Sequence, residues 1–112
     1  MLPIIERYID FNFTPNGQKS HLYIVIHDTG NFKKGATDES HYQYFKTANR
    51  NASADYFVDD DSISKLIRDK DASWAVGDGK GKYGITNSNS ISVEICVNAD
   101  GDYSKAVQHT LE

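Results

Sequence analysis

The chain has 112 residues, and its 12 basic against 16 acidic side chains leave a net charge of −4 at pH 7. This length suits one domain, and the acidic balance argues against a protein that tracks nucleic-acid phosphates through cationic contacts. No apolar run approaches the roughly 20 residues of a membrane helix, so we expect no membrane insertion. The first residues lack the charged and apolar regions of a signal peptide, which predicts synthesis in the cytoplasm.

The first half of the chain predicts a loop, a strand and a helix, in that order. Turn-forming residues dominate 13–20, and the apolar run 22–26 that follows is typical of a strand buried on both faces. This strand delivers His27 to a turn at its carboxyl end. Acids then open a pattern with helical spacing over 38–49.

The second half predicts a hairpin, a long loop, a strand and a final helix. The segments 54–58 and 63–67 flank an acidic turn and are typical of paired strands. Residues 69–90 are rich in turn formers and predict mostly irregular structure. Strict alternation of apolar residues makes 91–97 the clearest strand, and a helical pattern follows over 103–111.

Two residues are candidates for catalysis or metal binding. One lies at a strand end where ligands often bind, and the other is a carboxylate in a strand where burial would be unfavourable. His27 lies at the carboxyl end of a strand, where open sheets place ligands; the alternative is a core or capping histidine bonded to the backbone. Glu94 interrupts a strand of branched apolar residues, and burial there would raise its pKa toward the range of general acid–base work. The alternative is a half-exposed sheet, on which Ser92, Glu94 and Cys96 face solvent.

Other polar clusters predict no second site. The acid runs 59–61 and 100–102 do not match a calcium-binding loop and are interpreted as solvated turns. His41 lies on the predicted helix, where we expect it to be partly exposed, and none of the remaining histidines shows paired metal-ligand spacing. Cys96 is interpreted as a small buried hydrophobe, and Trp74 as a core or cleft-wall aromatic.

Four motifs follow one another in a specific order. They lie at 23–30 (YIVIHDTG), 52–60 (ASADYFVDD), 73–79 (SWAVGDG) and 84–98 (GITNSNSISVEICVN). This order resembles the zinc-dependent N-acetylmuramoyl-L-alanine amidases of phage endolysins and bacterial autolysins. Peptidoglycan recognition proteins are similar in fold. The resemblance covers about residues 20–110.

The resemblance implies a fold, a reaction and a partner. The fold is α/β in class (mixed α+β), a central mixed sheet flanked by helices, and residues 1–112 would form one partial amidase-like catalytic domain. The reaction is hydrolysis of the amide between N-acetylmuramic acid and L-alanine of the stem peptide, with zinc (Zn²⁺) polarising the carbonyl and activating water. The partner is bacterial peptidoglycan, which the protein would reach after release or export.

Site residues carry over from the resemblance by matching position. His27 is similar to the family's first zinc ligand, and Glu94 to the acid that handles the proton of the water. Asp28 and Thr29 match the motif, and we expect them to set the turn, orient His27 and contribute to substrate binding. Trp74 is expected to bind substrate as well.

Three departures from the family pattern affect the groove and the zinc. Asp55, also expected to bind substrate, stands where many relatives carry a histidine or tyrosine near the oxyanion, and an ionised aspartate would repel that charge. Ala75 stands where relatives often carry histidine, which removes a polar contact. The family's second zinc histidine and its third ligand lie beyond the final helix, and therefore beyond Glu112, so we expect a C-terminally truncated domain.

These departures leave three interpretations. A catalytic zinc takes three protein ligands, and His27 alone should hold it poorly, so we predict an amidase domain that is weak or inactive as this chain. The alternative is a non-catalytic module that binds peptidoglycan or muropeptides. A third interpretation is self-association through an apolar face left exposed by missing C-terminal helices.

Overall fold

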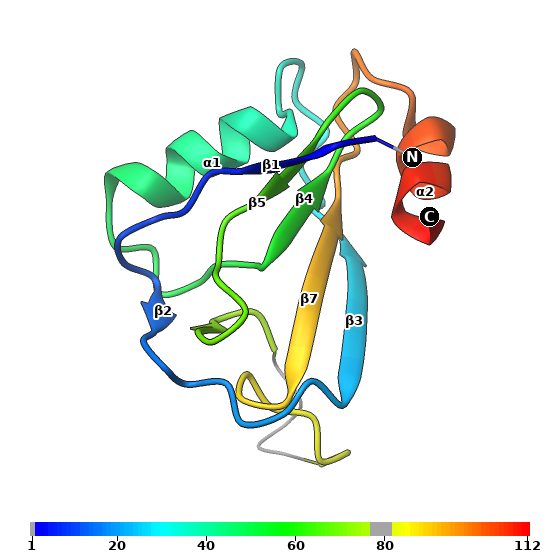
Figure 1. Ribbon diagram of the computed structural model, residues 1–112. Helices are drawn as coiled ribbons and strands as arrows, with labels where there is room; N and C mark the ends of the chain where they lie inside the picture. Colours follow the sequence, from blue (N-terminus) through cyan, green and yellow to red (C-terminus); the bar gives the residue numbers. More distant parts are fainter. Residues whose placement is uncertain (1, 77–81) are drawn as a thin grey trace.

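A computed structural model describes residues 2–76 and 82–112, and its main feature is a five-stranded mixed sheet between two helices (Figure 1). The strand order is β1 (Ile4–Glu6), β5 (Ile63–Lys65), β4 (Tyr56–Val58), β7 (Ser90–Ile95) and β3 (Tyr23–Asp28). Among the described strands of this sheet, β4 and β5 are the one antiparallel pair, which confirms the predicted hairpin. The mixed sheet confirms the predicted fold class.

Helix α1 (Asp38–Thr47) covers one face of the sheet through aromatic rings. Phe45 and His41 both stack on Phe57 of β4, with ring centroids 5.7 and 4.9 Å away. The helix begins after Thr37, whose hydroxyl accepts a hydrogen bond from the Ser40 amide at 3.2 Å. The predicted helix over 38–49 is therefore confirmed, with its end two residues earlier.

A buried asparagine from the N-terminal segment holds the end of α1. Asn12 is 1% exposed, and its side-chain amide donates to the carbonyls of Phe45 and Ala48, both at 2.9 Å. Its side-chain oxygen accepts from the Arg50 amide at 2.7 Å. The φ of Asn12 is +67°, a left-handed conformation that asparagine tolerates better than most residues.

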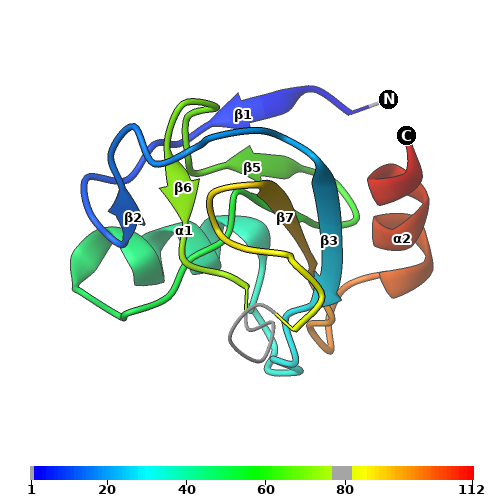
Figure 2. The same ribbon diagram turned by 90° about the horizontal axis from the view of Figure 1, so that it is seen from below.

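Helix α2 (Tyr103–Leu111) packs on the other face, against β4 and β7, and confirms the predicted final helix. Figure 2 shows α1 and α2 on opposite sides of the sheet. Ala106 is 1% exposed where α2 meets the strands, and the Asp102 side chain caps the helix by accepting from the Lys105 amide. In the described part of the chain, no helix has the length and apolar character needed to cross a membrane.

The prediction that 22–26 is buried on both faces is wrong. Strand β3 lies at the edge of the sheet and pairs only with β7, and α2 packs on β7 and β4 (Figure 1). Leu22, Ile24 and Ile26 are accordingly 70, 71 and 51% exposed. An apolar run predicts a strand, but the neighbours that decide its burial come from distant parts of the chain.

Two very short strands lie in segments that the sequence predicts as loops. β2 (Phe13–Thr14) and β6 (Ala72–Ser73) form an antiparallel pair of two residues each, too short to show periodicity. The end of β6 positions the side chain of Trp74. The predicted loop 69–90 and the motif 73–79 extend into 77–81, which lie outside the described residues.

Candidate active site

His27 and Glu94 lie side by side on neighbouring parallel strands. The register of β3 and β7 pairs His27 with Glu94, and the register of β7 and β4 pairs Glu94 with Phe57. Side chains that pair across strands share a face of the sheet. The three side chains therefore form one row on the face that α1 covers.

This row opens into a groove between the strand ends, α1 and the segment after β6. The groove is a cavity of about 240 Å³ whose lining includes His27, Thr29, His41, Trp74 and Glu94. A second cavity of about 170 Å³ adjoins it and shares the side chains of His27 and Glu94. The sheet thus brings the two predicted residues together at the wall of a single depression.

Glu94 combines partial burial with a raised pKa. Burial raises the pKa of its carboxyl to about 7, the neighbouring His27 opposes the rise, and Asp28 adds to it. Both protonation states are then populated near neutral pH, as general acid–base catalysis requires. The alternative of a solvent-facing polar stripe is wrong, because Ser92 and Cys96 are only 4 and 2% exposed.

The turn after β3 fixes the position of His27. The Asp28 carboxylate accepts from the Gly30 amide at 2.9 Å, and the Thr29 hydroxyl accepts from the Asn31 amide at 3.3 Å. Gly30 has a φ of +66°, which favours glycine at this position. Asp28 and Thr29 line the groove while setting the turn, and their contact with a substrate stays a prediction.

Asp55 does not occupy the predicted position on the groove wall. It is 5% exposed, and its Oδ2 accepts hydrogen bonds from the Ser92 amide (2.9 Å) and from the hydroxyls of Ser73 (2.9 Å) and Ser92 (3.2 Å). Burial raises the pKa of this carboxyl, and these three hydrogen bonds oppose the rise. Asp55 therefore joins β4, β6 and β7 beneath the groove instead of facing a substrate.

Trp74 forms part of the groove wall, which confirms its interpretation as a cleft aromatic. Its indole nitrogen donates to the Thr14 hydroxyl at 2.9 Å, and its backbone amide donates to the Ser53 hydroxyl at 3.0 Å. The indole contact ties Trp74 to β2 at the wall of the groove. Ala75 lines the groove beside it.

His41 is the groove residue that sequence reasoning missed. It lies on α1 with its ring against Phe57, and it lines the groove together with Glu94 and Trp74. The one signal in the sequence is its position four residues after the helix cap at Thr37, which fixes its place on the first turn of the helix. Nothing in the local sequence pattern shows that this turn of the helix faces the row formed by His27, Glu94 and Phe57.

The described residues do not complete a zinc site around His27. Within 2–76 and 82–112, the one group of three side chains able to hold a metal is Asp38, Asp59 and Asp61, whose ligand oxygens lie within 4.8 Å of one another. That group does not include His27, and carboxylate oxygens alone suit calcium or magnesium better than zinc. Among the described residues, no group of three ligands thus includes His27, whereas a catalytic zinc takes three protein ligands.

Glu112 marks the position beyond which the family's other zinc ligands are expected. It follows α2, on the face of the sheet opposite to α1, and its backbone amide donates to the His109 carbonyl oxygen at 3.3 Å. Its carboxylate lies 3.3 Å from Nδ1 of the same histidine. Both residues line a separate cavity of about 190 Å³, so neither supplies a ligand beside His27. The expectation of ligands beyond Glu112 stays a prediction.

The acid group corrects the prediction of a solvated turn at Asp59, whereas Asp61, Asp100 and Asp102 are exposed as predicted. Asp59 is 2% exposed, and its carboxylate accepts from the Asp60 amide at 2.8 Å and the Asp38 amide at 3.2 Å. Hydroxyls of Ser62 and Ser64 donate to the Asp38 carboxylate at 2.7 and 2.6 Å. These hydrogen bonds join the start of α1 to the β4–β5 hairpin, so the group has a structural explanation.

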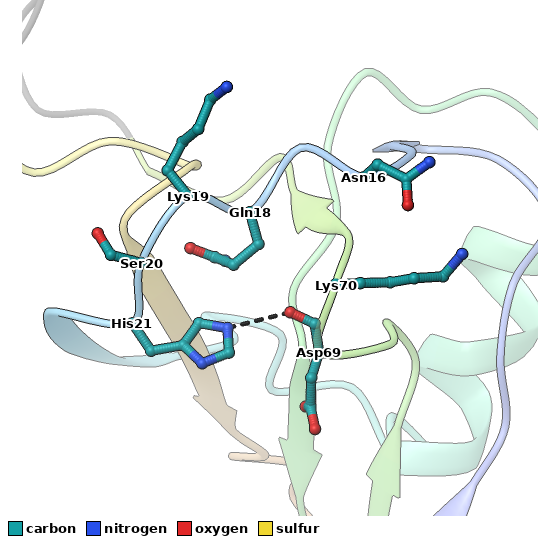
Figure 3. A pocket seen from close by; sticks show the side chains of 7 residues that line it. All are labelled: Asn16, Gln18, Lys19, Ser20, His21, Asp69 and Lys70. Atoms are coloured by element: carbon teal, nitrogen blue, oxygen red, sulfur yellow. Dashed lines mark hydrogen bonds between the residues drawn. The ribbon is translucent and has the colours of Figure 1, made fainter.

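A larger cavity, of about 400 Å³, lies beyond the other end of β3 (Figure 3). Its one imidazole, His21, is bonded through Nε2 to the Asp69 carbonyl oxygen at 3.0 Å, and the Asp69 carboxylate pairs with Lys65 at 2.8 Å. The side chains of Lys19 and Lys70 extend in different directions. This cavity lacks a histidine and a carboxylate that face each other, so the groove is the better candidate for catalysis.

Comparison with known proteins gives one family. The family model described as "N-acetylmuramoyl-L-alanine amidase" matches residues 17–112. Two Bacillus subtilis (strain 168) relatives are similar: the N-acetylmuramoyl-L-alanine amidase XlyA is 37% identical over 108 residues, and the N-acetylmuramoyl-L-alanine amidase CwlH is 39% identical over 95. The matches cover 95% and 85% of this chain, which spans 35% and 37% of the length of these relatives.

A solved structure supports the same grouping. The structure of a mutant endolysin from Bacillus subtilis superposes with a TM-score of 0.87 at 35% sequence identity. The match covers 98% of this chain and 71% of the solved one. The similarity therefore includes the sheet and both helices.

Proposed function

The chain belongs to the N-acetylmuramoyl-L-alanine amidase family, and we propose that it binds peptidoglycan and cleaves the amide between N-acetylmuramic acid and L-alanine of the stem peptide. The observation that carries this proposal is the pairing of His27 with Glu94 at the wall of the groove. A carboxyl with a pKa of about 7 is suited to proton transfer at neutral pH.

In this proposal, Glu94 removes a proton from the water that attacks the amide carbonyl. The same carboxyl then returns a proton to the nitrogen of L-alanine as the C–N bond breaks. Trp74 provides the wall against which the substrate lies, and the Asp28–Thr29 turn holds His27 at the rim.

His27 is the one described residue that we assign to zinc binding. By family resemblance His27 is one zinc ligand, and the described residues supply no set of three that includes it. We therefore propose that this chain by itself holds zinc weakly and hydrolyses the wall slowly or not at all. No step above depends on the metal.

The test is prolonged incubation of the chain, at high concentration and with added Zn²⁺, with purified peptidoglycan. Mass spectrometry would detect stem peptides with a free L-alanine amino group, which only cleavage of this amide produces. We expect slow release by the wild type and at least a hundredfold less by Glu94→Gln, since a general base typically contributes about 10²–10⁴-fold. Bound zinc, measured after dialysis, should be well below one ion per chain.

Two controls separate the outcomes. Glu6→Gln removes an exposed acid on β1, far from the groove in the sheet order, and should leave release unchanged. Retention of the chain on the wall with no released peptide would favour the alternative, a peptidoglycan-binding module. The incomplete set of zinc ligands among the described residues is the observation that supports this alternative. A chain that neither binds the wall nor releases peptide would contradict both proposals.

A further inference from the structure

His41 has a fixed arrangement of its two ring nitrogens. Its Nδ1 lies 2.7 Å from the Thr37 carbonyl oxygen, one turn earlier in α1. A carbonyl oxygen only accepts hydrogen bonds, so Nδ1 carries the proton and donates it. In the neutral ring, Nε2 is then the unprotonated nitrogen and can only accept.

The ring is also held in orientation. It stacks on Phe57 with a centroid distance of 4.9 Å and an interplanar angle of 16°. Phe57 is itself 3% exposed and pairs in register with Glu94, so the surface under the imidazole belongs to the active-site row. The two contacts restrict both torsions of the histidine side chain before any ligand binds.

The acceptor edge of this ring is unused within the protein. The imidazole lines the groove, and Nε2 has no hydrogen-bond partner among residues 2–76 and 82–112. Two other polar groups of the groove are already bonded: the Trp74 indole donates to Thr14, and the Ser53 hydroxyl donates to the Asn12 carbonyl oxygen at 2.6 Å. His41 therefore offers the groove a pre-oriented acceptor.

We propose that His41 is a substrate-binding residue whose Nε2 accepts a hydrogen bond from an N–H or O–H donor of the muropeptide in the groove. This inference rests on the proposed function. The donor is either an amide N–H of the stem peptide or a hydroxyl or N-acetyl group of the sugar. Because the acceptor is fixed in advance, little side-chain entropy is lost when the hydrogen bond forms.

The experiment measures binding of a soluble muropeptide to the full chain, so that it does not depend on turnover. The probe is N-acetylmuramoyl-L-alanyl-D-isoglutamine, titrated by calorimetry into the wild type, His41→Phe and His41→Gln. Phenylalanine keeps a ring against Phe57 and removes the acceptor, and we expect binding about 3- to 10-fold weaker, the effect of one neutral hydrogen bond. Glutamine places an amide oxygen near the position of Nε2, and it should recover part of the loss.

A matched control and a spectroscopic readout exclude a merely structural role. Ser40→Ala changes the neighbouring exposed position on the same helix and should bind like the wild type. In the free wild-type protein, ¹⁵N spectra of the histidine rings should show His41 protonated on Nδ1. The lone-pair Nε2 resonance should move when the probe binds.

An analogue of the probe identifies the donor. If methylation of the amide nitrogen that follows L-alanine weakens wild-type binding but not His41→Phe binding, the donor is the peptide N–H. If His41→Phe weakens the probe and the analogue equally, the donor is another N–H or a hydroxyl of the probe. Equal binding by the wild type and His41→Phe, or a His41 ring protonated on Nε2, would overturn the role of His41 but leave the proposed function standing. A wild type that binds no muropeptide would overturn both.

Discussion

At the scale of single residues, two carboxylates on the same face of the sheet have different environments. Asp55 is almost fully buried and accepts three hydrogen bonds, from the Ser92 amide and from two serine hydroxyls. Glu94 is less buried, but its carboxylate makes no hydrogen bond with a described residue that would offset burial, and burial raises its pKa to about 7. Hydrogen-bond donors stabilise the charged form of a carboxyl group, whereas burial destabilises it. Asp55 is therefore suited to holding strands together, and Glu94 to moving a proton.

This difference predicts the effect of removing the Asp55 carboxylate. Asp55→Ala would leave the Ser92 amide and the Ser73 hydroxyl buried without their acceptor, which should lower the free energy of unfolding by about 2–3 kcal/mol. Urea denaturation followed by Trp74 fluorescence measures the change. Asp10→Ala, at an exposed position, should stay within about 0.5 kcal/mol of the wild type. Equal effects of the two substitutions would contradict the structural role.

The same pair shows what the sequence could predict at this scale. Glu94 is detectable from the sequence because burying a carboxylate among branched apolar residues costs free energy unless the carboxylate has a partner. Asp55 has no such signal, since its donors Ser73 and Ser92 come from segments 18 and 37 residues away. The family resemblance places a groove residue at this position, and only the packing shows that this carboxylate lies beneath the groove.

At the scale of elements, α1 carries His41 to the groove and depends on an anchor at its far end. Asn12 satisfies the carbonyls of Phe45 and Ala48, which otherwise would have no partner at the helix terminus. The Asn12 carbonyl oxygen in turn accepts from the Ser53 hydroxyl, next to the groove. One buried residue thus links the N-terminal segment, the helix and the candidate active site.

Two substitutions of Asn12 separate its hydrogen bonds from its backbone conformation. Asn12→Ala removes the bonds and places a Cβ at a φ of +67°, and it should cost about 3–4 kcal/mol of unfolding free energy. Asn12→Gly removes the same bonds without the steric penalty and should be about 1 kcal/mol less damaging. Thermal or urea denaturation of both variants provides the comparison. A glycine variant no better than alanine would show that the left-handed conformation contributes nothing.

Elements with long, regular patterns are predictable from this sequence, and elements defined by distant partners are not. Alternation over 91–97 and helical spacing over 103–111 predicted the strand β7 and the helix α2. β2 and β6 have two residues each and exist only because they pair across the molecule. The exposure of β3 likewise follows from its place at the edge, which no local pattern contains.

At the scale of the whole molecule, buried acids couple the fold to pH. Burial raises the pKa of the Asp59 carboxyl to about 6, and the neighbouring charges of Asp60 and Asp38 add to the rise against two backbone hydrogen bonds. The unfolded chain has the ordinary value of 3.8. The folded state therefore binds this proton more tightly, and the stabilisation is complete below about pH 4 and is lost as the pH rises through about 6.

Asp59→Asn should remove this dependence. The free energy of unfolding of the wild type minus that of the variant should fall as the pH rises from 4 to 6.5, because only the wild type loses the proton in that window. Urea denaturation at three pH values, with a chelator present to exclude metal effects, measures the difference. The exposed control Asp10→Asn shows how much the loss of any surface carboxylate changes the free energy of unfolding at each pH. A constant difference for Asp59→Asn would refute the coupling.

The edge position of β3 determines which part of the fold is expected to open first on heating. His27 is held by hydrogen bonds to a single neighbouring strand, whereas Glu94 lies on a strand with partners on both sides. Fraying on heating would therefore begin at β3 and separate the imidazole from the acid while the interior around Phe57 and Leu66 is still packed. The proposed site would then be lost before the fold, and the hydrogen bonds between β3 and β7 would set the temperature at which His27 and Glu94 separate.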